Sequence, residues 1–563
     1  MGNDIVKVFA LGGLDENGRD CYVVEINDDI FVLDCGTCLP DKTIPGIDFM
    51  VPNPTYLIKN KDRIRAYIIT HGHDESMSGL KYFYSKAPAP VYATKHTLGL
   101  LLGQAKYEGI NLKVNSVEVE PTSTVQIAGR EIRFFQTCHN TINSCGVAIW
   151  TDQGYVIYTS DFIIDFVGQN KGYFFDLKAL EDISKKPTLL LMAESKNATR
   201  PGYCSPKHRV AKLIEKHFKD GNRRIFISCF WQNVFRIEEI FELCKKYRKK
   251  VFYYNEQTRR IMEAGITVEP NILHGVEIVG KENFLRVKET DLVILMLGKD
   301  EELYDQIAAL AEGKNEDRRI VLNEKDIFIN VSLPRPMLET KCTRSMDLVY
   351  RTGCDVQWLK KDQLTAMHAR EDDLKFFMTV LRPKYYMPVR GNFINMMANA
   401  KLAVSMNIGL NYSNVFILDN GMEIIFDGKV RPQIIPNEVN KITIDPILID
   451  GTGVNRLGSQ VISDRLMLAQ DGIVIIAGTV DLNKQEIIAG PDCQMRGFVF
   501  VKEAEPLLKS LSAIFVDEIN TAFQSGNFNI EDVKNNISER AKRFIKRENG
   551  REPYVMAIIV PIE

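Results

Sequence analysis

Residues 69–83 read ITHGHDESMSGLKYF, and this stretch decides which fold and which chemistry the chain can support. A strand-like run, Ala66 to Ile69, ends in His71-Gly72-His73. Two histidines placed two residues apart at the end of a strand can turn both imidazoles to one side of a loop and share a metal ion. Glu75 and Ser76 follow, where a further strong ligand would be expected. The stretch therefore predicts a metal site that has two histidine ligands and lacks a further strong ligand.

Three further polar residues stand where other predicted strands end. Asp34, His139 and Asp161 each end or follow a short run rich in Val, Ile, Tyr and Phe. Taken alone, each is more typical of a cap, a turn or a hydrogen-bonded core histidine. Together with the His71 loop they form four polar groups at four strand ends, the place where functional loops commonly lie. The combination favours one shared edge of a pair of sheets.

Length and composition indicate a soluble protein of several domains. A chain of 563 residues is too long for one hydrophobic core and predicts three or four units. It is 45% apolar and 26% charged, and it has no apolar run near the ~18 residues that span a bilayer, so we expect no membrane segment. The first residues lack a basic region and a long apolar core, which predicts no secretory signal and a cytoplasmic location.

The eleven cysteines lack the paired spacing of a structural zinc site. We expect reduced and mostly buried thiols. Cys35-Gly-Thr-Cys38 does fit the C-x-x-C pattern of a redox dithiol, but no thioredoxin-like sequence surrounds it.

The formal charge is −2, so binding of nucleic acid would have to rest on local patches. Residues 245–250 and 540–551 are the candidates, although each alone is more typical of a solvated helix face.

The length and spacing of the apolar runs change along the chain. Up to about residue 200, short strand-like runs alternate with Gly/Asp turns, which indicates layered sheets with helices outside. From about 206 to 350, strands alternate with helices of 10 to 15 residues, a pattern typical of a parallel-sheet α/β unit. Residues 427–441 are polar with two prolines and predict a linker, and the tail from 442 predicts a small α+β domain.

The order of these residues resembles a known family. His71-Gly-His73, His139, Asp161, the α/β insert and then His368 are similar to the metallo-beta-lactamase fold with a beta-CASP insertion, and within that group to the ribonuclease J family over essentially the whole length. The supporting stretches are 9–13 (FALGG), 46–52 (GIDFMVP), 195–202 (SKNATRPG), 388–391 (PVRG), 448–453 (LIDGTG), 489–491 (AGP) and 496–500 (RGFVF).

The resemblance implies an α/β fold: an αββα sandwich with an inserted parallel-sheet beta-CASP domain and a small α+β C-terminal domain. The expected boundaries are 1–205 for the first part of the beta-lactamase domain, 206–350 for the beta-CASP domain, 351–430 for the return segment, 431–445 for a linker and 446–563 for the C-terminal domain.

Members of the family hydrolyse RNA, as 5′ to 3′ exonucleases and as endonucleases, with two metal ions that hold a hydroxide and polarise the phosphodiester. By resemblance, the first ion would take His71, His73, His139 and the bridging Asp161, with Asp34 supporting them from behind. The second ion depends on a pattern that this chain breaks, because Glu75 stands for an Asp, Ser76 for a His and Arg390 for a later His.

Arginine cannot ligate a metal, since its guanidinium stays protonated and has no free lone pair. We therefore expect at most one ordered ion per chain, zinc or manganese, or none, with Arg390 in the place of the second ion and paired with Glu75. Asp161, Glu75 and His368 are the candidate catalytic residues.

The resemblance also implies a pocket for a 5′-monophosphate, with His368, Asn233 and Arg390 as candidate RNA or phosphate contacts. The family's Ser-Gly-His turn is here Ala366-Met367-His368, and Gln232 stands where members usually have a serine. For His368, RNA contact and a structural role stay equally open.

Two functions remain. The chain is either an RNA-binding ribonuclease J paralogue with weak or absent hydrolysis that partners an active ribonuclease J, or a working metal-dependent ribonuclease that uses one ion or a pair rebuilt from Glu75 and Asp74. The lost ligands favour the first. A small-molecule hydrolase of the same fold is less consistent with the insert and the tail. Dimers or tetramers, of this chain alone or with a paralogue, are expected from the resemblance.

Overall fold

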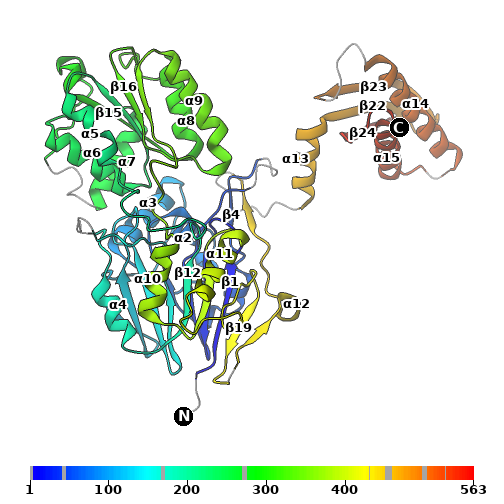
Figure 1. Ribbon diagram of the computed structural model, residues 1–563. Helices are drawn as coiled ribbons and strands as arrows, with labels where there is room; N and C mark the ends of the chain where they lie inside the picture. The colour runs from blue at the N-terminus through cyan, green and yellow to red at the C-terminus, as the bar shows by residue number, and fades with distance from the viewer. Residues whose placement is uncertain are drawn as a thin grey trace. The chain divides into compact units, whose positions relative to one another are not determined.

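A computed structural model describes residues 4–40, 46–166, 172–268, 275–429, 431–450, 459–497, 504–526 and 528–562 (Figure 1). The chain forms two compact units, one of residues 1–39 and 50–447 and the other of residues 40–49 and 448–563. The short strands β4 (Phe49–Val51) and β21 (Ile447–Ile449) lie where the chain passes between the units.

The first unit is built on two packed sheets. The larger sheet has the order β20-β19-β1-β2-β3-β5-β6-β7, and the smaller has the order β18-β12-β11-β10-β9-β8. The larger sheet consists of β1 (Val6–Gly12), β2 (Cys21–Ile26), β3 (Asp29–Leu33), β5 (Ile64–Ile68), β6 (Val91–Ala93), β7 (Ser116–Glu118), β19 (Glu423–Phe426) and β20 (Gln433–Ile435). The smaller consists of β8 (Thr124–Ile127), β9 (Arg130–Gln136), β10 (Cys145–Thr151), β11 (Gly154–Tyr158), β12 (Thr188–Glu194) and β18 (Tyr385–Val389).

Helices cover the outer faces of both sheets. One apolar core lies between the sheets, and a second core lies under α4, α10 and α11 on the smaller sheet. Because the central strands are buried on both faces, β12 reads TLLLMAE and does not alternate. The helices of this part are α1 (Thr55–Lys59), α2 (Asp74–Met77), α3 (Lys95–Tyr107), α4 (Leu177–Ser184), α10 (Glu371–Leu381), α11 (Phe393–Ser405) and α12 (Asn437–Asn440).

The insert is a five-stranded parallel sheet of order β14-β15-β13-β16-β17. Helices α5, α6 and α7 pack on one face, and α8 and α9 pack on the other (Figure 1). Its strands are β13 (Ile225–Phe230), β14 (Lys250–Tyr253), β15 (Leu292–Gly298), β16 (Ile327–Asn330) and β17 (Asp355–Trp358). Its helices are α5 (Ala211–Asp220), α6 (Val234–Lys246), α7 (Glu256–Val268), α8 (Asp300–Ala311) and α9 (Glu339–Arg351).

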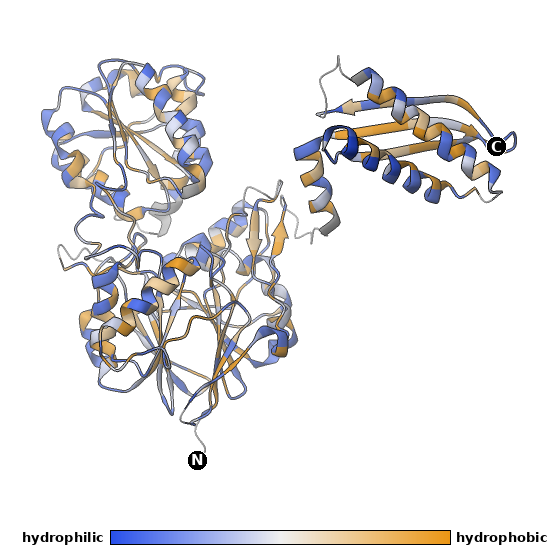
Figure 2. Cartoon of the chain, turned by 45° about the vertical axis from the view of Figure 1, so that its right-hand side comes forward, coloured by the Kyte–Doolittle hydropathy of each residue, from blue (hydrophilic) through white to orange (hydrophobic). Residues whose placement is uncertain are grey.

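The second unit is a small α+β domain. Its three-stranded sheet, β23-β22-β24, buries alternate residues of β22 under α14 and α15, so one face carries the core (Figure 2). Its elements are α13 (Ser459–Asp471), β22 (Ile473–Asp481), β23 (Glu486–Arg496), α14 (Ala504–Gln524), α15 (Ile530–Asn549) and β24 (Tyr554–Ile562).

This architecture confirms the expected sandwich, parallel-sheet insert and α+β tail. Two details differ from the expected boundaries. Residues 433–435 form β20 and extend the larger sheet, so the predicted linker at 431–445 is partly a strand. Residues 355–358 form β17 and pair with β16, so the sheet of the insert continues beyond residue 350. Two quoted motifs, 448–453 and 496–500, lie partly outside the described residues.

No helix of the described ranges is long and apolar enough to cross a bilayer.

The loop after β3 is bound to α2 by backbone hydrogen bonds. Cys35 N–H donates to the Ser76 carbonyl at 2.6 Å, and Thr37 N–H donates to the Asp74 carbonyl at 2.9 Å. Gly36 lies between them, and a Cβ built on it would stand 1.6 Å from the Glu75 carbonyl oxygen. This contact positions the polar residues of both loops.

We predict that Gly36→Ala destabilises the first unit by about 1–3 kcal/mol, because the added methyl group must displace backbone and not a flexible side chain. The measurement is the free energy and the midpoint of thermal unfolding. Gly103→Ala, in α3, is the matched control, since its Cβ would meet no atom within 4 Å and a helical alanine is favoured over glycine. Equal midpoints for the two variants would contradict the close packing of the two loops.

Candidate metal centre

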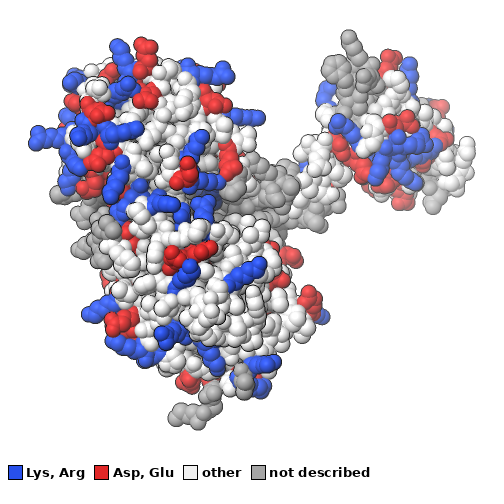
Figure 3. Space-filling view, in the orientation of Figure 1, with Lys and Arg blue, Asp and Glu red and all other residues white. Residues whose placement is uncertain are grey.

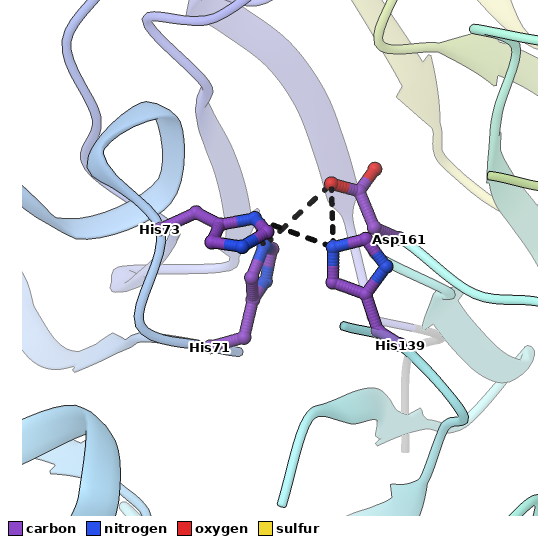
Figure 4. Close-up of side chains that lie close together, drawn as sticks. All are labelled: His71, His73, His139 and Asp161. Carbon is purple, nitrogen blue, oxygen red and sulfur yellow. Dashed lines mark hydrogen bonds and ion pairs between the residues drawn. The ribbon is translucent and has the colours of Figure 1, made fainter. Parts of the chain in front are cut away.

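Three histidines and one aspartate meet at the ends of strands from both sheets (Figure 4). His71 and His73 follow β5, His139 follows β9 and Asp161 follows β11. His73 Nδ1 lies 3.2 Å from His71 Nε2 and 3.3 Å from His139 Nε2. Asp161 Oδ2 lies 3.6 Å from His71 Nε2 and 3.7 Å from His139 Nε2. A tetrahedral zinc ion with bonds of 2.0–2.2 Å has ligand separations of about 3.3–3.6 Å, so these four atoms fit one ion.

The outer ring nitrogens are held by partners behind the ligands. His139 Nδ1 donates to the Met367 carbonyl at 2.8 Å, and His73 Nε2 faces the Gln232 carbonyl at 3.4 Å. His71 Nδ1 lies 2.9 Å from Thr70 Oγ1, which in turn donates to Asp34 at 2.8 Å. Such partners fix the tautomer and turn the remaining lone pairs inward. Burial also holds the pKa of His71 and of His139 well below its usual value, which keeps both rings neutral as ligation requires.

Arg390 lies next to this centre and is fully buried. It follows β18 and its guanidinium faces three carboxylates, Asp20 at 2.8 Å, Asp161 at 3.0 Å and Asp34 at 3.1 Å. Tyr158 and Ser76 complete the contacts, at 2.7 and 3.1 Å. Burial alone would lower the pKa of Arg390, but the carboxylates raise it well above its usual value. The side chain is therefore a cation without a lone pair.

A second cation stands on the same carboxylate. Lys196 Nζ lies 3.3 Å from Asp161 Oδ2 and 3.5 Å from Glu75 Oε1. Burial would raise the pKa of Asp161, but Arg390 and then Lys196 hold it well below its usual range. A second metal ion placed beside Asp161 Oδ2 would meet the Arg390 guanidinium and the Lys196 ammonium group. Neither group can ligate a metal ion. The groups gathered here do not fit a second ion.

The predicted pairing of Arg390 with Glu75 is wrong. Among the described contacts, Glu75 pairs with Lys196, while Arg390 reaches deeper to Asp20, Asp34 and Asp161. The physical reason is charge density, because three buried carboxylates at strand ends attract the guanidinium more strongly than one carboxylate on the helix.

Asp74 is tied to the insert. It forms an ion pair with Lys299 at the end of β15, and it accepts hydrogen bonds from Gln232 at 3.1 Å, Ser78 at 2.8 Å and Gln104 at 2.7 Å. Burial would raise the pKa of Asp74, but Lys299 lowers it to about 2. Both oxygens of the Asp74 carboxylate thus already have partners.

His368 and Asn233 have different surroundings. His368 Nδ1 lies 3.1 Å from Glu194 Oε2 and 3.5 Å from Asp161 Oδ1, beside the metal centre. Asn233 caps α6, with its side-chain oxygen accepting from Arg236 N–H at 3.1 Å, so its oxygen is already in use.

Three residues of the site were missed from sequence: Asp20, Glu194 and Lys196. Glu194 ends the apolar run TLLLMAE, which is the same strand-end signal that identified Asp34. Lys196 lies in one of the quoted family stretches, but no role followed from it there. Asp20 lies in the loop before β2 and has no sequence signal.

The other sequence candidates have structural explanations. Cys35 and Cys38 are buried free thiols, and burial raises the pKa of Cys38 to about 12. In the two basic patches, several cations have acidic partners, as in Lys250 with Glu277 and Arg540 with Glu518, both at 2.8 Å. These are charged helix and strand surfaces.

Comparison with known proteins matches three family models in chain order. They are the metallo-beta-lactamase superfamily over residues 14–195, the ribonuclease J beta-CASP domain over 222–349 and the ribonuclease J C-terminal domain over 460–562. A solved structure of a protein of unknown function from Enterococcus faecalis V583 shares the fold, with a TM-score of 0.50 and 13% identity over 75% of this chain and 100% of that one.

Two curated relatives match the full length. Ribonuclease J2 of Bacillus subtilis (strain 168) is 30% identical over 99% of each chain. Ribonuclease J 2 of Staphylococcus aureus (strain NCTC 8325 / PS 47) is 28% identical over 100% of this chain and 99% of its own. The predicted resemblance is confirmed, and this chain belongs to the ribonuclease J family.

Proposed function

We propose that this chain is an RNA-binding ribonuclease J protein of cytoplasmic RNA processing and decay, with weak or absent hydrolysis. It holds one tightly bound ion, zinc or manganese, at His71, His73, His139 and Asp161, and it works in an assembly with an active ribonuclease J. The observation that carries the proposal is the fully buried Arg390 guanidinium, 3.0 Å from Asp161 Oδ2.

The loss of a second ion would weaken the chemistry in two ways. An ion pair in such a site both generates the nucleophile and stabilises the charge on the attacking and leaving oxygens. Arg390 supplies positive charge, but that charge is already shared among three carboxylates. The missing ion should cost several kcal/mol of transition-state stabilisation, which corresponds to at least ~10³ in rate.

The second candidate, an active ribonuclease with a rebuilt ion pair, would need Glu75 and Asp74 as ligands. The contacts count against it, because Lys196 pairs with Glu75 and Lys299 pairs with Asp74. Each carboxylate would have to give up an ammonium partner before it could bind an ion.

RNA binding is supported by the family and by cations from the insert beside the metal centre. Lys299 pairs with Asp74, and Arg335 lies 3.1 Å from Asp300. An RNA phosphate can replace a carboxylate as the partner of such a cation, with an affinity that falls as salt rises. Elsewhere on the visible face of the insert, basic and acidic side chains intermingle (Figure 3). The cations around the centre are therefore the favoured contacts.

We predict one zinc ion per chain by elemental mass spectrometry, after zinc loading and gel filtration. We expect no degradation of a 5′-monophosphorylated RNA above that of Asp161→Ala, in zinc or in manganese. Asp161→Ala removes the carboxylate of the ligand set and so also controls for a contaminating nuclease. Two zinc ions with degradation that depends on Asp161 would refute the proposal.

We predict that the combined variant Glu75→Asp, Ser76→His, Arg390→His binds a second zinc ion and degrades RNA at least ~10-fold faster than the wild type, because it restores the family's ligands. Arg390→His alone is the matched comparison. It should be less stable by about 3–5 kcal/mol, since it leaves Asp20 and Asp34 buried without their cation. A combined variant that folds and still binds one zinc ion would contradict the assignment of the second position.

Assembly is tested by sedimentation velocity of this chain mixed with an active ribonuclease J from the same cell. We predict a single faster-sedimenting species at equimolar mixing, and fluorescence anisotropy should show that the chain alone binds RNA with salt-dependent affinity. Two unchanged boundaries would exclude the mixed assembly, and an absence of RNA binding at low salt would exclude the RNA-binding role.

A further inference from the structure

Asp161 contacts Arg390 through Oδ2, and its second oxygen, Oδ1, lies next to His368. We propose that Asp161 Oδ1, Glu194 Oε2 and His368 Nδ1 form an additional cation site, which takes Mn²⁺ or another hard divalent ion. The site uses the carboxylate oxygen other than Oδ2, which Arg390 and Lys196 contact. It goes beyond the proposed function, which concerns only the two ion positions of the family.

The geometry of the three atoms suits one ion. His368 Nδ1 lies 3.1 Å from Glu194 Oε2 and 3.5 Å from Asp161 Oδ1, and all three ligand atoms lie within 4.8 Å of one another. Ligands bound at about 2.1–2.2 Å are separated by about 3.0 Å at a right angle and about 3.5 Å at a tetrahedral angle. Both separations from His368 Nδ1 fall in this interval, so an ion can replace the Nδ1–H proton without moving the backbone. That proton passes to solvent.

The free oxygen is the second observation. Asp161 is 0% exposed, and Oδ1 has no hydrogen-bond donor within the described part of the chain. Two cations and two imidazoles approach the other oxygen, Oδ2: Arg390, Lys196, His71 and His139. Among the described residues, the His368 ring is the one ion-pair partner of Oδ1, at 3.5 Å, which is too long for a strong hydrogen bond. A buried carboxylate oxygen that lacks a close hydrogen-bond donor is costly, and a bound cation would relieve that cost.

Glu194 is placed as a ligand by the backbone. Its Oε1 accepts N–H groups of Phe162 and Ala369, both at 2.9 Å, which orients Oε2 toward His368. Glu194 is fully buried, whereas the His368 side chain is 17% exposed, so an ion can enter past the imidazole. Two carboxylate oxygens and one imidazole form a harder donor set than the three imidazoles of the neighbouring centre, which favours manganese here and zinc there.

The test is a titration with Mn²⁺ of the full chain loaded with one equivalent of zinc. Zinc holds the three-histidine centre because it binds such ligands more tightly than manganese does. Electron paramagnetic resonance measures the free Mn²⁺ that remains, and we expect one bound Mn²⁺ per chain with hyperfine coupling to one imidazole nitrogen. Glu194→Gln should weaken binding at least ~10-fold, because the amide keeps an oxygen for the two backbone N–H groups and loses the charged ligand.

Two variants make the result specific. His368→Gln should remove the nitrogen coupling and weaken Mn²⁺ binding in the same way, and it keeps the test valid if Glu194→Gln does not fold. Glu75→Gln is the matched control, since it changes a neighbouring carboxylate that pairs with Lys196 and lies outside the proposed ligand set, and it should leave Mn²⁺ binding unchanged.

Two outcomes would overturn the inference. Mn²⁺ uptake no greater than that of Asp161→Asn would exclude the site and leave the proposed function intact. Uptake that is lost in Glu75→Gln and kept in Glu194→Gln would place the ion at the family's second position, and would overturn the proposed function as well.

Discussion

The buried contact between one guanidinium and three carboxylates determines how the rest of the centre is arranged. Asp20, Asp34 and Asp161 come from three different loops, and Arg390 is the cation they share. Arg390 does not fully offset the burial of these carboxylates, because burial raises the pKa of Asp20 to about 7 in spite of Arg390. Asp34 and Arg390 also hold left-handed backbone conformations, with φ of 57° at both, as does Ser160 with φ of 55°. Such strain persists where surrounding contacts fix the chain.

The outline of the fold was predictable because each layer has a clear periodicity. Buried central strands such as β12 are continuous apolar runs, and the insert alternates strands with amphipathic helices. Short strands at sheet edges were not predictable from the sequence. Strand β20 lies between two prolines and is mostly exposed, so its residues have the composition of a linker and become a strand only by pairing with β19. Edge strands of this kind are specified by their neighbours more than by their own residues.

The grouping of the candidate ligands was predictable from sequence, and the cations that pair with them were not. Histidines after strands have a recognisable spacing, and the structure brings His71, His73 and His139 together with Asp161. The partner of Arg390 could not be chosen from sequence, because Glu75 and Asp20 are both acidic and only depth in the fold separates them. Lys196 illustrates the same limit, since one ammonium group bridges residues that lie 121 and 35 positions away along the chain.

The Arg390 contact also limits how this position can change. The guanidinium faces Asp20, Asp34 and Asp161, so any substitution here alters the charge around three buried carboxylates at once. A change of Arg390 to a metal ligand is therefore costly as a single step, since removal of the guanidinium alone exposes buried acids to mutual repulsion. Several substitutions would have to be made together. The contact that stabilises the centre thus makes the chemistry of this position depend on its neighbours.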